Sequence, residues 1–303
     1  MTHAEIQPLT TAARATWRHY LELTKPRLSF MSVITAMVGY LAAVPYSYWD
    51  WKRTLLVVLG TALCAGGVAA LNMWMEGDTD ARMQRTANRP IPAGIIAPGS
   101  AFVVGWVLCL GGLAVLFKQV NGLSAFLALA TIVAYLAIYT PAKRWSRWNT
   151  ELGAISGALP PMIGWAAAGR SSPGLGWTLF AILFAWQMPH FFALAWTYRK
   201  DYAAAGMPML SVVDPSGTKV ARWTFIWTVL LTAASLMPTL LGYCSWYYFA
   251  VVALLDLWFL RAAFQFLDPA RREAVARRVF LISIAYLPLL MIALVADRMI
   301  FRL

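Results

Sequence analysis

One short segment of the sequence, residues 71–90, places acids and arginines directly after a long apolar run. Three of the 13 acidic residues of the chain, Glu76, Asp78 and Asp80, lie within five positions there. Asn72, Glu76 and Asp80 are spaced four residues apart, so on a continuous helix they share one face. That face offers an amide oxygen and two carboxylates, and Mg²⁺ prefers such oxygen ligands together with substrate phosphates. The spacing therefore predicts a Mg²⁺ site for a phosphorylated substrate.

The same segment continues with three arginines. Arg82, Arg85 and Arg89 are spaced three and four residues apart, which places them on one face of a helix. The planar guanidinium group suits phosphate oxygens, so acids for a metal beside cations for an anion indicate a diphosphate site. Asp78 would point away from the acid face unless Gly77 unwinds the helix. The alternative is a solvated loop with internal salt bridges, which does not explain the regular acid spacing at an apolar boundary.

Two further polar segments carry residues of the same kinds. The first lies at and after the end of the fourth apolar run, residues 121–139. There we expect a cationic, hydrogen-bonding patch made by Tyr139, Lys143, Arg144 and Asn149. The alternative is that these cations only follow the positive-inside rule for cytoplasmic loops. The second follows the sixth apolar run. Its Asp201, between Lys200 and Tyr202, is a candidate second metal carboxylate, and the alternative is an ion pair with Lys200 or Arg199.

Two ionisable residues lie inside apolar runs. His190 is seven positions before the end of the sixth run, about 10 Å along a helix, and the adjacent Pro189 is expected to kink that helix. An ionisable side chain at such a depth is a candidate functional group. A histidine hydrogen-bonded to a neighbouring helix is the alternative. For Asp256, inside the eighth run, we favour structural pairing.

The elements that must position these residues are transmembrane helices. Charged residues make up only 13% of the 303 residues, about half of what soluble domains carry, and the apolar runs reach the roughly 20 residues that cross a bilayer. Short links between runs favour one all-α antiparallel bundle, so we expect a single intramembrane domain over residues 1–303, with residues 1–27 as a cytoplasmic N-terminal segment. The nine predicted spans are 28–46, 54–75, 99–117, 121–139, 150–169, 174–197, 219–242, 245–266 and 277–298.

The net charge of +12 does not indicate nucleic acid, because most cations lie before spans 1, 3, 5, 7 and 9. The positive-inside rule makes that side cytoplasmic, with the N-terminus inside. The three polar segments all fall on this side, so they can converge above a hydrocarbon-lined cavity that suits a diphosphate head and an apolar tail. Three scattered cysteines show no metal-ligand spacing.

At these residues the chain resembles the UbiA superfamily of intramembrane prenyltransferases, and within it the branch that farnesylates haem. The resemblance covers about residues 20–300. The superfamily motif spans Asn72 to Pro90, followed by Tyr139-Thr140-x-x-Lys143-Arg144. The haem branch is suggested by Trp186-Gln187-Met188-Pro189-His190 and Lys200-Asp201-Tyr202-x-x-Ala205-Gly206-x-Pro208-Met209-Leu210.

The resemblance implies transfer of the farnesyl group of farnesyl diphosphate to the 2-vinyl group of haem B, with water addition, giving haem O and diphosphate. It implies an enzyme of the bacterial cytoplasmic membrane whose site faces the cytoplasm, with haem-modifying or terminal-oxidase assembly proteins as downstream partners. Haem B is a substrate here and Mg²⁺ the cofactor. The implied metal ligands are Asn72, Glu76, Asp78, Asp80 and Asp201; the diphosphate contacts are Arg85, Arg89, Lys143, Arg144 and Asn149; the haem or substrate contacts are His190, Tyr139, Lys200 and Tyr202.

Two departures from the superfamily pattern concern the metal. Glu76 stands where an aspartate is usual, and Asp201 has no acid four residues away, so the number of metal ions is open. Three rival functions also remain at this point. One is a related prenyltransferase acting on an aromatic acid or a quinone precursor, another is a membrane transporter, and the third is a non-catalytic haem-handling protein.

Overall fold

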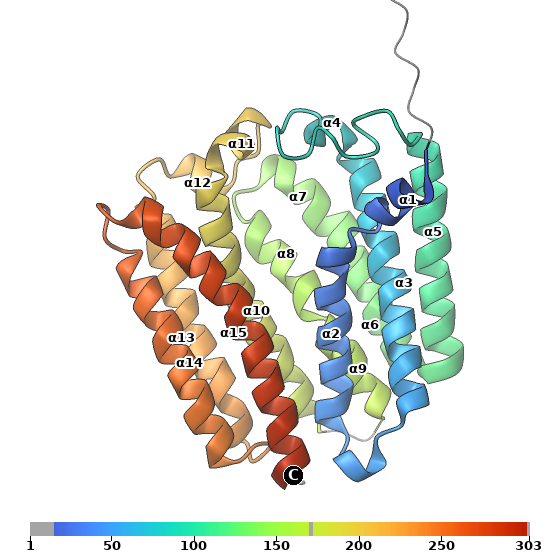
Figure 1. Ribbon diagram of the computed structural model, residues 1–303, viewed down its shortest axis with the longest axis vertical. Coiled ribbons are helices and arrows are strands. Elements are labelled where there is room, and N and C mark those ends of the chain that lie inside the picture. Colours follow the sequence, from blue (N-terminus) through green and yellow to red (C-terminus); the bar gives the residue numbers. More distant parts are fainter. Residues whose placement is uncertain (1–14, 170–171, 302–303) are drawn as a thin grey trace, which may run out of the picture.

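The computed structural model describes residues 15–169 and 172–301, and all regular structure in these residues is helical. The predicted all-α fold is thus confirmed. Eight segments are long and apolar enough to cross a membrane, and they lie alongside one another in one bundle (Figure 1). They are α2 (Pro26–Ala43), α3 (Trp51–Met75), α5 (Pro98–Val115) with η2 (Leu116–Val120), α6 (Gly122–Val133) with η3 (Ala134–Tyr139) and α7 (Thr140–Trp145), α10 (Pro173–Thr197), α13 (Thr218–Leu240), α14 (Trp246–Gln265) and α15 (Arg272–Phe301).

The fifth predicted span, 150–169, is a broken helix. It consists of α8 (Asn149–Ala158) and α9 (Pro160–Ala168), so that eight long segments and this pair account for the nine predicted spans. The break coincides with Pro160 and Pro161, which have no backbone N–H to donate to the preceding turn. The Gln187 side chain of α10 donates to the carbonyl of Ala154 in α8, 3.3 Å away, and so ties this half of the broken span to the following helix.

The starts of the long helices follow from local sequence. Asp50 caps α3 by accepting from the backbone N–H groups of Lys52 (2.9 Å) and Arg53 (3.2 Å). Asn121 caps α6 and Ser245 caps α14 in the same way. Proline lies in the first turn of α2, α5, α9 and α10, where its missing N–H costs nothing.

The buried apolar residues form two large clusters. One lies mainly among α10, α13, α14 and α15, and the other among α2, α3, α5, α6 and α9. The α2–α9 contact is close because Gly39 and Gly164 meet backbone of the opposite helix, where a Cβ would clash with Pro161 and Ala36 respectively. The two halves meet along α10, which contacts α8 and α9 as well as α13 and α15.

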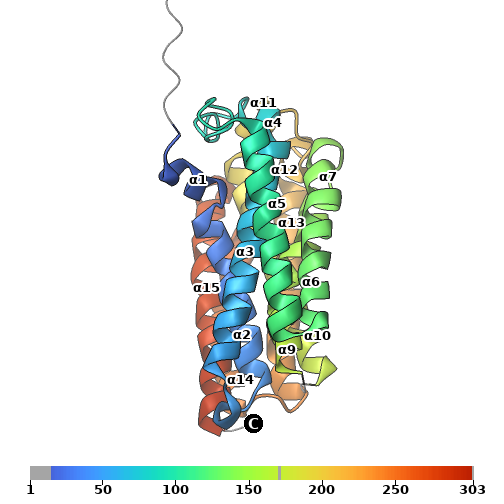
Figure 2. The ribbon, with the colours of Figure 1, turned by 90° about the vertical axis from the view of Figure 1, so that its right-hand side faces the viewer.

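The short helices gather at one end of the bundle, which we call the loop end. Figures 1 and 2 place α1, α4, α7, α11 and α12 there, with the end of α15 and the link between α2 and α3 at the opposite end. This link contains the 3-10 helix η1 (Tyr46–Tyr48). Of the predicted N-terminal segment, residues 1–14 lie outside the described residues, and the remainder includes α1. The short elements at the loop end are α1 (Trp17–Leu23), α4 (Gly77–Asp80), α11 (Arg199–Ala204) and α12 (Leu210–Val213).

Candidate active site

The acid segment lies at the loop end, where α3 stops and α4 begins. The helix is interrupted at Glu76, whose backbone torsions (φ −102°, ψ 8°) leave the helical region. Asn72, Glu76 and Asp80 are nevertheless all buried, at 1%, 5% and 1% exposure. Asp78 is not turned inward by the break, since 57% of its side chain is exposed. The four-residue spacing thus selects the three buried side chains, although the helix is not continuous.

The prediction that Arg82, Arg85 and Arg89 share a helical face was wrong. No helix covers residues 81–97; α4 ends at Asp80, and the following segment is a series of turns. The Thr86 hydroxyl donates to the carbonyl of Asp80 at 2.8 Å and holds this turn segment against the end of α4. Hydrogen bonds of this local kind compete with helix formation.

Each acid of the segment is paired with a cation. Lys143 Nζ lies 2.7 Å from Glu76 Oε1, and Arg89 Nη1 lies 2.6 Å from Asp80 Oδ2. Burial raises the pKa of Glu76, but the charge and hydrogen bond of Lys143 outweigh burial and hold that pKa below its ordinary value. Glu76 and Asp80 are thus each buried directly beside a cation of the same cluster.

The third pair, between Asp78 and Arg144, lies at the surface. Arg144 Nη2 lies 2.7 Å from Asp78 Oδ1 and also donates to the carbonyl of Met75 at 2.8 Å. Although burial raises the pKa of Asp78, the Arg144 charge and hydrogen bonds from Thr79 lower it below its ordinary value. Both Lys143 and Arg144 belong to α7, at the end of the fourth span. This span therefore supplies the partners of Glu76 and Asp78, the two acids that lie just after the second span.

A further cation, Lys25, belongs to this cluster and was not among the predicted site residues. Its Nζ donates to Asn72 Oδ1 at 2.6 Å, while Asn72 Nδ2 donates to the Thr140 hydroxyl at 3.1 Å. Burial and then the charge of Arg89 lower the pKa of Lys25 to about 7. Among the described residues, Lys25 alone combines a positive φ (45°) with a side chain other than glycine. Backbone strain of this kind is concentrated at functional sites.

The third loop joins the cluster through Arg85. Arg85 Nη2 donates to the Tyr202 hydroxyl at 3.3 Å. Its guanidinium carbon also lies 5.2 Å from the ring centroid of Tyr202 and 5.8 Å from that of Tyr198, within range of a cation–π interaction. The structure thus brings together the three polar segments that lie after spans 2, 4 and 6 and the start of span 1.

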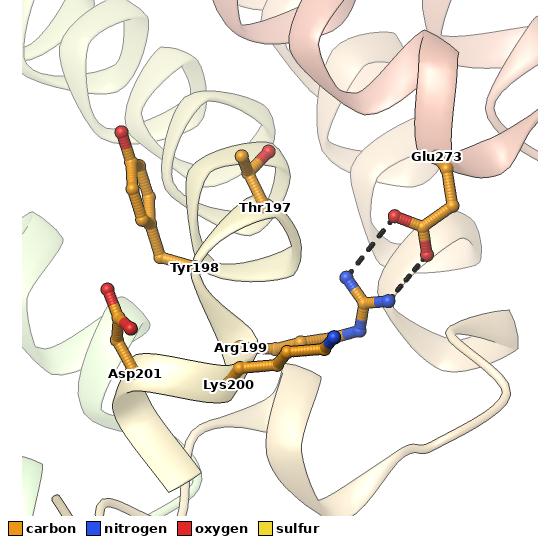
Figure 3. Close-up of a pocket in the computed structure, with 6 residues that line it drawn as sticks. All are labelled: Thr197, Tyr198, Arg199, Lys200, Asp201 and Glu273. Atoms are coloured by element: carbon orange, nitrogen blue, oxygen red, sulfur yellow. Dashed lines mark hydrogen bonds and ion pairs between the residues drawn. The ribbon is translucent and has the colours of Figure 1, made fainter. Parts of the chain in front are cut away.

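Asp201 lies in α11 and lines a pocket at the loop end (Figure 3). Arg199 pairs with Glu273 at 2.6 Å instead. Within residues 15–169 and 172–301, no ion pair joins Asp201 to Lys200 or Arg199, so the alternative interpretation of Asp201 is not supported. Lys200 lines the same pocket.

The remaining predicted residues have different contacts. Tyr139 presents its ring to Lys143 Nζ, 4.5 Å from the centroid. Asn149 is fully buried at the start of α8 and donates to the carbonyl of Ser146 at 2.7 Å. His190 Nδ1 shares a 2.8 Å hydrogen bond with Ser283 Oγ of α15, the bond expected of a structural histidine. Its role as a substrate contact stays a prediction.

The cluster can exchange its internal ion pairs for an external ligand. The described residues hold no ready group of three or more His, Cys, Asp or Glu side chains for a metal, because each acid turns to its cation. The donor set consists of oxygens alone, one amide and three carboxylates, which fits Mg²⁺ rather than a softer metal. If a diphosphate bound together with Mg²⁺, its oxygens would pair with the lysine and arginines and the Mg²⁺ would pair with the carboxylates. Each member of the three ion pairs would then have a new partner of opposite charge.

Comparison with known proteins agrees with this geometry. The model of the UbiA prenyltransferase family matches residues 32–285. A protoheme IX farnesyltransferase of Opitutus terrae is 56% identical over 290 residues, covering 96% of this chain and 98% of the relative. The fold is similar to that of digeranylgeranylglyceryl phosphate synthase, with a TM-score of 0.79, 17% identity and 93% and 98% of the two chains covered.

A second solved structure, a UbiA homologue of Archaeoglobus fulgidus bound to GPP and Mg²⁺, matches with a TM-score of 0.66, 14% identity and 92% and 99% of the chains covered. The family match spans most of the sequence, and the relative is similar along almost its whole length. The transporter and the non-catalytic haem-handling protein are thereby excluded. The chain is an integral membrane prenyltransferase and belongs to the UbiA prenyltransferase family.

Proposed function

We propose that the protein transfers the farnesyl group of farnesyl diphosphate to the 2-vinyl group of haem B, with addition of water, to give haem O and diphosphate. The observation that carries the donor half is the set of three acid–cation pairs, Asp80–Arg89, Glu76–Lys143 and Asp78–Arg144, in one cluster. The acceptor half is supported by relatives that are named protoheme IX farnesyltransferase.

In this proposal Asn72, Glu76, Asp78 and Asp80 hold Mg²⁺, with Asp201 as an additional carboxylate. When bound, Mg²⁺ would neutralise charge on the departing diphosphate. The released cations then contact the diphosphate oxygens. Preorganised cations of this kind stabilise the charge that develops on a leaving group; they are Lys25, Arg85, Arg89, Lys143 and Arg144.

The reaction balances as follows. The bond between farnesyl C1 and the diphosphate oxygen breaks, and its electron pair leaves with the diphosphate. The π electrons of the vinyl group form the new carbon–carbon bond to C1, which leaves a cation on the carbon next to the porphyrin ring. Water adds to that carbon and loses a proton. Burial of Asn72, Glu76 and Asp80 fits the need to keep water from the farnesyl cation before the bond forms.

We further propose that the loop end faces the cytoplasm of a bacterial cell, because the positive-inside rule places most of the lysines and arginines there. The rival acceptor is an aromatic acid or a quinone precursor, which would use the same donor site. The two acceptors differ in the product, so the product decides between them.

The experiment is an assay of the purified protein in detergent with haem B, farnesyl diphosphate and Mg²⁺, with the haem product identified by mass. We expect a gain of one farnesyl group and one water, and no product when EDTA removes the metal. Metal-dependent prenylation of an aromatic acceptor, with unchanged haem, would overturn the acceptor assignment. Farnesylation that is insensitive to EDTA would overturn the role of the acid segment.

A further inference from the structure

The groove that carries a further inference lies between α10 and α15 at the loop end. A pocket of about 350 Å³ is lined by residues 197–201 and Glu273. A second pocket of about 230 Å³ is lined by Leu194, Thr197, Tyr198, Arg277, Phe280 and Leu281. Thr197 and Tyr198 line both pockets, so the two are adjoining parts of one groove, which we call the α10–α15 groove.

The groove is polar at one end and apolar along its length. Lys200 lies at the polar end and Arg277 lies beside the apolar part. Neither cation has an ion pair within the described ranges 15–169 and 172–301, whereas Arg199 is held by Glu273 (Figure 3). The apolar wall includes Leu281, whose side chain is 53% exposed.

The groove adjoins the diphosphate site through one shared side chain. Tyr198 lines both pockets, and its ring lies 5.8 Å from the guanidinium carbon of Arg85. Asp201 lines the polar pocket, and Tyr202, the next residue, accepts a hydrogen bond from Arg85. A molecule in the groove would therefore lie next to the place where the farnesyl diphosphate is held.

Aromatic rings pack behind the apolar part of the groove. Phe280 lines the apolar pocket, and its ring centroid lies 4.9 Å from that of His190. His190 is in turn stacked on Trp186 at 4.8 Å and hydrogen-bonded to Ser283. The groove thus has the Phe280 ring on its apolar wall, and that ring is backed by the packed side chains of His190 and Trp186.

We propose that the α10–α15 groove binds the acceptor as a flat, apolar macrocycle with two carboxylates on one edge, which is the chemistry of haem B. The carboxylates lie at Lys200 and Arg277, and the ring lies against Leu194, Phe280 and Leu281. The cations Lys200 and Arg277 and the apolar wall support this occupant, because an uncharged lipid tail or a free anion would match only one of the two features. Of the acids at the polar end, Glu273 is paired with Arg199, and Asp201 is assigned to the metal. The inference rests on the proposed function for the identity of the acceptor.

The experiment is a titration of the purified full-length protein with haem B, without farnesyl diphosphate, followed by the haem absorption spectrum. Arg277→Glu reverses one cation of the groove, and Arg278→Glu is its matched control. Arg278 is the neighbouring exposed cation, but it turns to Gln265 of α14, 3.4 Å away. We expect Arg277→Glu to raise the Kd for haem at least about tenfold and the control to leave it within about twofold.

A second pair of variants tests the apolar wall. Leu281→Trp fills the groove, and Ile292→Trp places the same ring three turns further along α15 at a position that is 64% exposed. We expect weaker haem binding from Leu281→Trp alone. Mg²⁺-dependent binding of farnesyl diphosphate, measured on each variant, should stay unchanged and so show that the donor site is folded.

Each result leads to a distinct conclusion. If the wild-type protein binds and farnesylates haem, but neither groove variant weakens haem binding, the groove assignment is wrong while the proposed function stands. If the wild-type protein farnesylates a different acceptor and does not bind haem, the proposed function fails and the groove proposal fails with it. Selective weakening by Arg277→Glu and Leu281→Trp, with both controls unaffected, supports the groove.

Discussion

The buried carboxylates of this protein are stabilised in two different ways. At the loop end, Asp80 pairs with Arg89 of the same segment, and Glu76 pairs with Lys143 of α7. In the middle of the bundle, Asp256 is 2% exposed and accepts hydrogen bonds from two neutral hydroxyl groups. They belong to Tyr286 (2.6 Å) and Ser235 (2.9 Å).

A third carboxylate extends the comparison to the opposite end of the bundle. Asp297 of α15 accepts from the Ser245 hydroxyl and from the Ser245 backbone N–H, 2.9 Å away. It therefore ties the start of α14 to α15. Asp256 and Asp297 link helices through fixed hydroxyl and backbone donors, whereas the loop-end acids have charged partners that an anionic ligand can take away. Neutral donors indicate structural roles, and exchangeable cations indicate a binding site.

The largest effect should come from Asp80→Asn. Removing this buried negative charge should reduce turnover at least about 10³-fold, because the metal and the leaving group both depend on it. Asp268→Asn is the control, since Asp268 also pairs with an arginine (Arg271, 3.4 Å) but lies outside the cluster. The measurement is haem farnesylation with thermal unfolding of each variant in detergent. Full turnover by both Asp80→Asn and Asp78→Asn would show that the acids do not hold the metal.

Lys25→Met should come next. It keeps an apolar stem of similar length but removes the charge beside Asn72, and we expect turnover to fall about 10–100-fold. Lys52→Met, at the opposite end of the bundle, is the comparison variant. Steady-state kinetics with varied farnesyl diphosphate would check this, and unchanged kinetics in Lys25→Met would remove Lys25 from the site.

Arg85→Ala should have a smaller effect, since Arg85 is exposed and contacts Tyr202, Tyr198 and the sulfur of Met83 rather than an acid of the segment. We expect the KM for farnesyl diphosphate to rise about tenfold with kcat little changed. The readout is KM and kcat, each determined separately for the variant and the wild type. A KM equal to that of the wild type would show that the charge of Arg85 serves membrane orientation by the positive-inside rule and not substrate binding.

Asp256→Asn should separate stability from activity. The two hydroxyl groups donate to different oxygens of Asp256, and asparagine has an NH₂ donor in place of one of them, so the free energy of unfolding should fall by about 1–3 kcal/mol. Turnover of the folded protein should stay within about twofold of wild type. Thermal unfolding and specific activity, measured on one preparation, check both halves, and a loss of activity without loss of stability would contradict the structural role.

The sequence alone predicted much of this arrangement because two regular patterns carry it. Apolar runs of membrane-spanning length located the helices, and the four-residue spacing selected Asn72, Glu76 and Asp80. The pairing partners could not be predicted, since Lys143 lies 67 residues from Glu76 and meets it only through helix packing. Lys25 was missed because the positive-inside rule also explains a single cation just before a membrane span.

Two local errors have local causes. The turns at Arg82–Arg89 depend on side-chain hydrogen bonds such as that of Thr86, which periodicity does not register. The break in the fifth span did have a sequence signal, the pair Pro160-Pro161, but the surrounding apolar composition concealed it.

The broken fifth span has a consequence for how the chain is assembled in the membrane. At 1.5 Å per residue, α8 and α9 each reach about half of the hydrocarbon thickness, so neither can be inserted as an independent transmembrane segment. Pro160 and Pro161 leave the carbonyls of Ser156 and Gly157 without their helical N–H partners. The Gln187 side chain, which packs against Gly157 and donates to the carbonyl of Ala154, belongs to the following span and is synthesised later. A nascent chain that stops before α10 therefore exposes unpaired backbone to lipid, and we expect cells to degrade such truncated chains while they retain those that extend past residue 197.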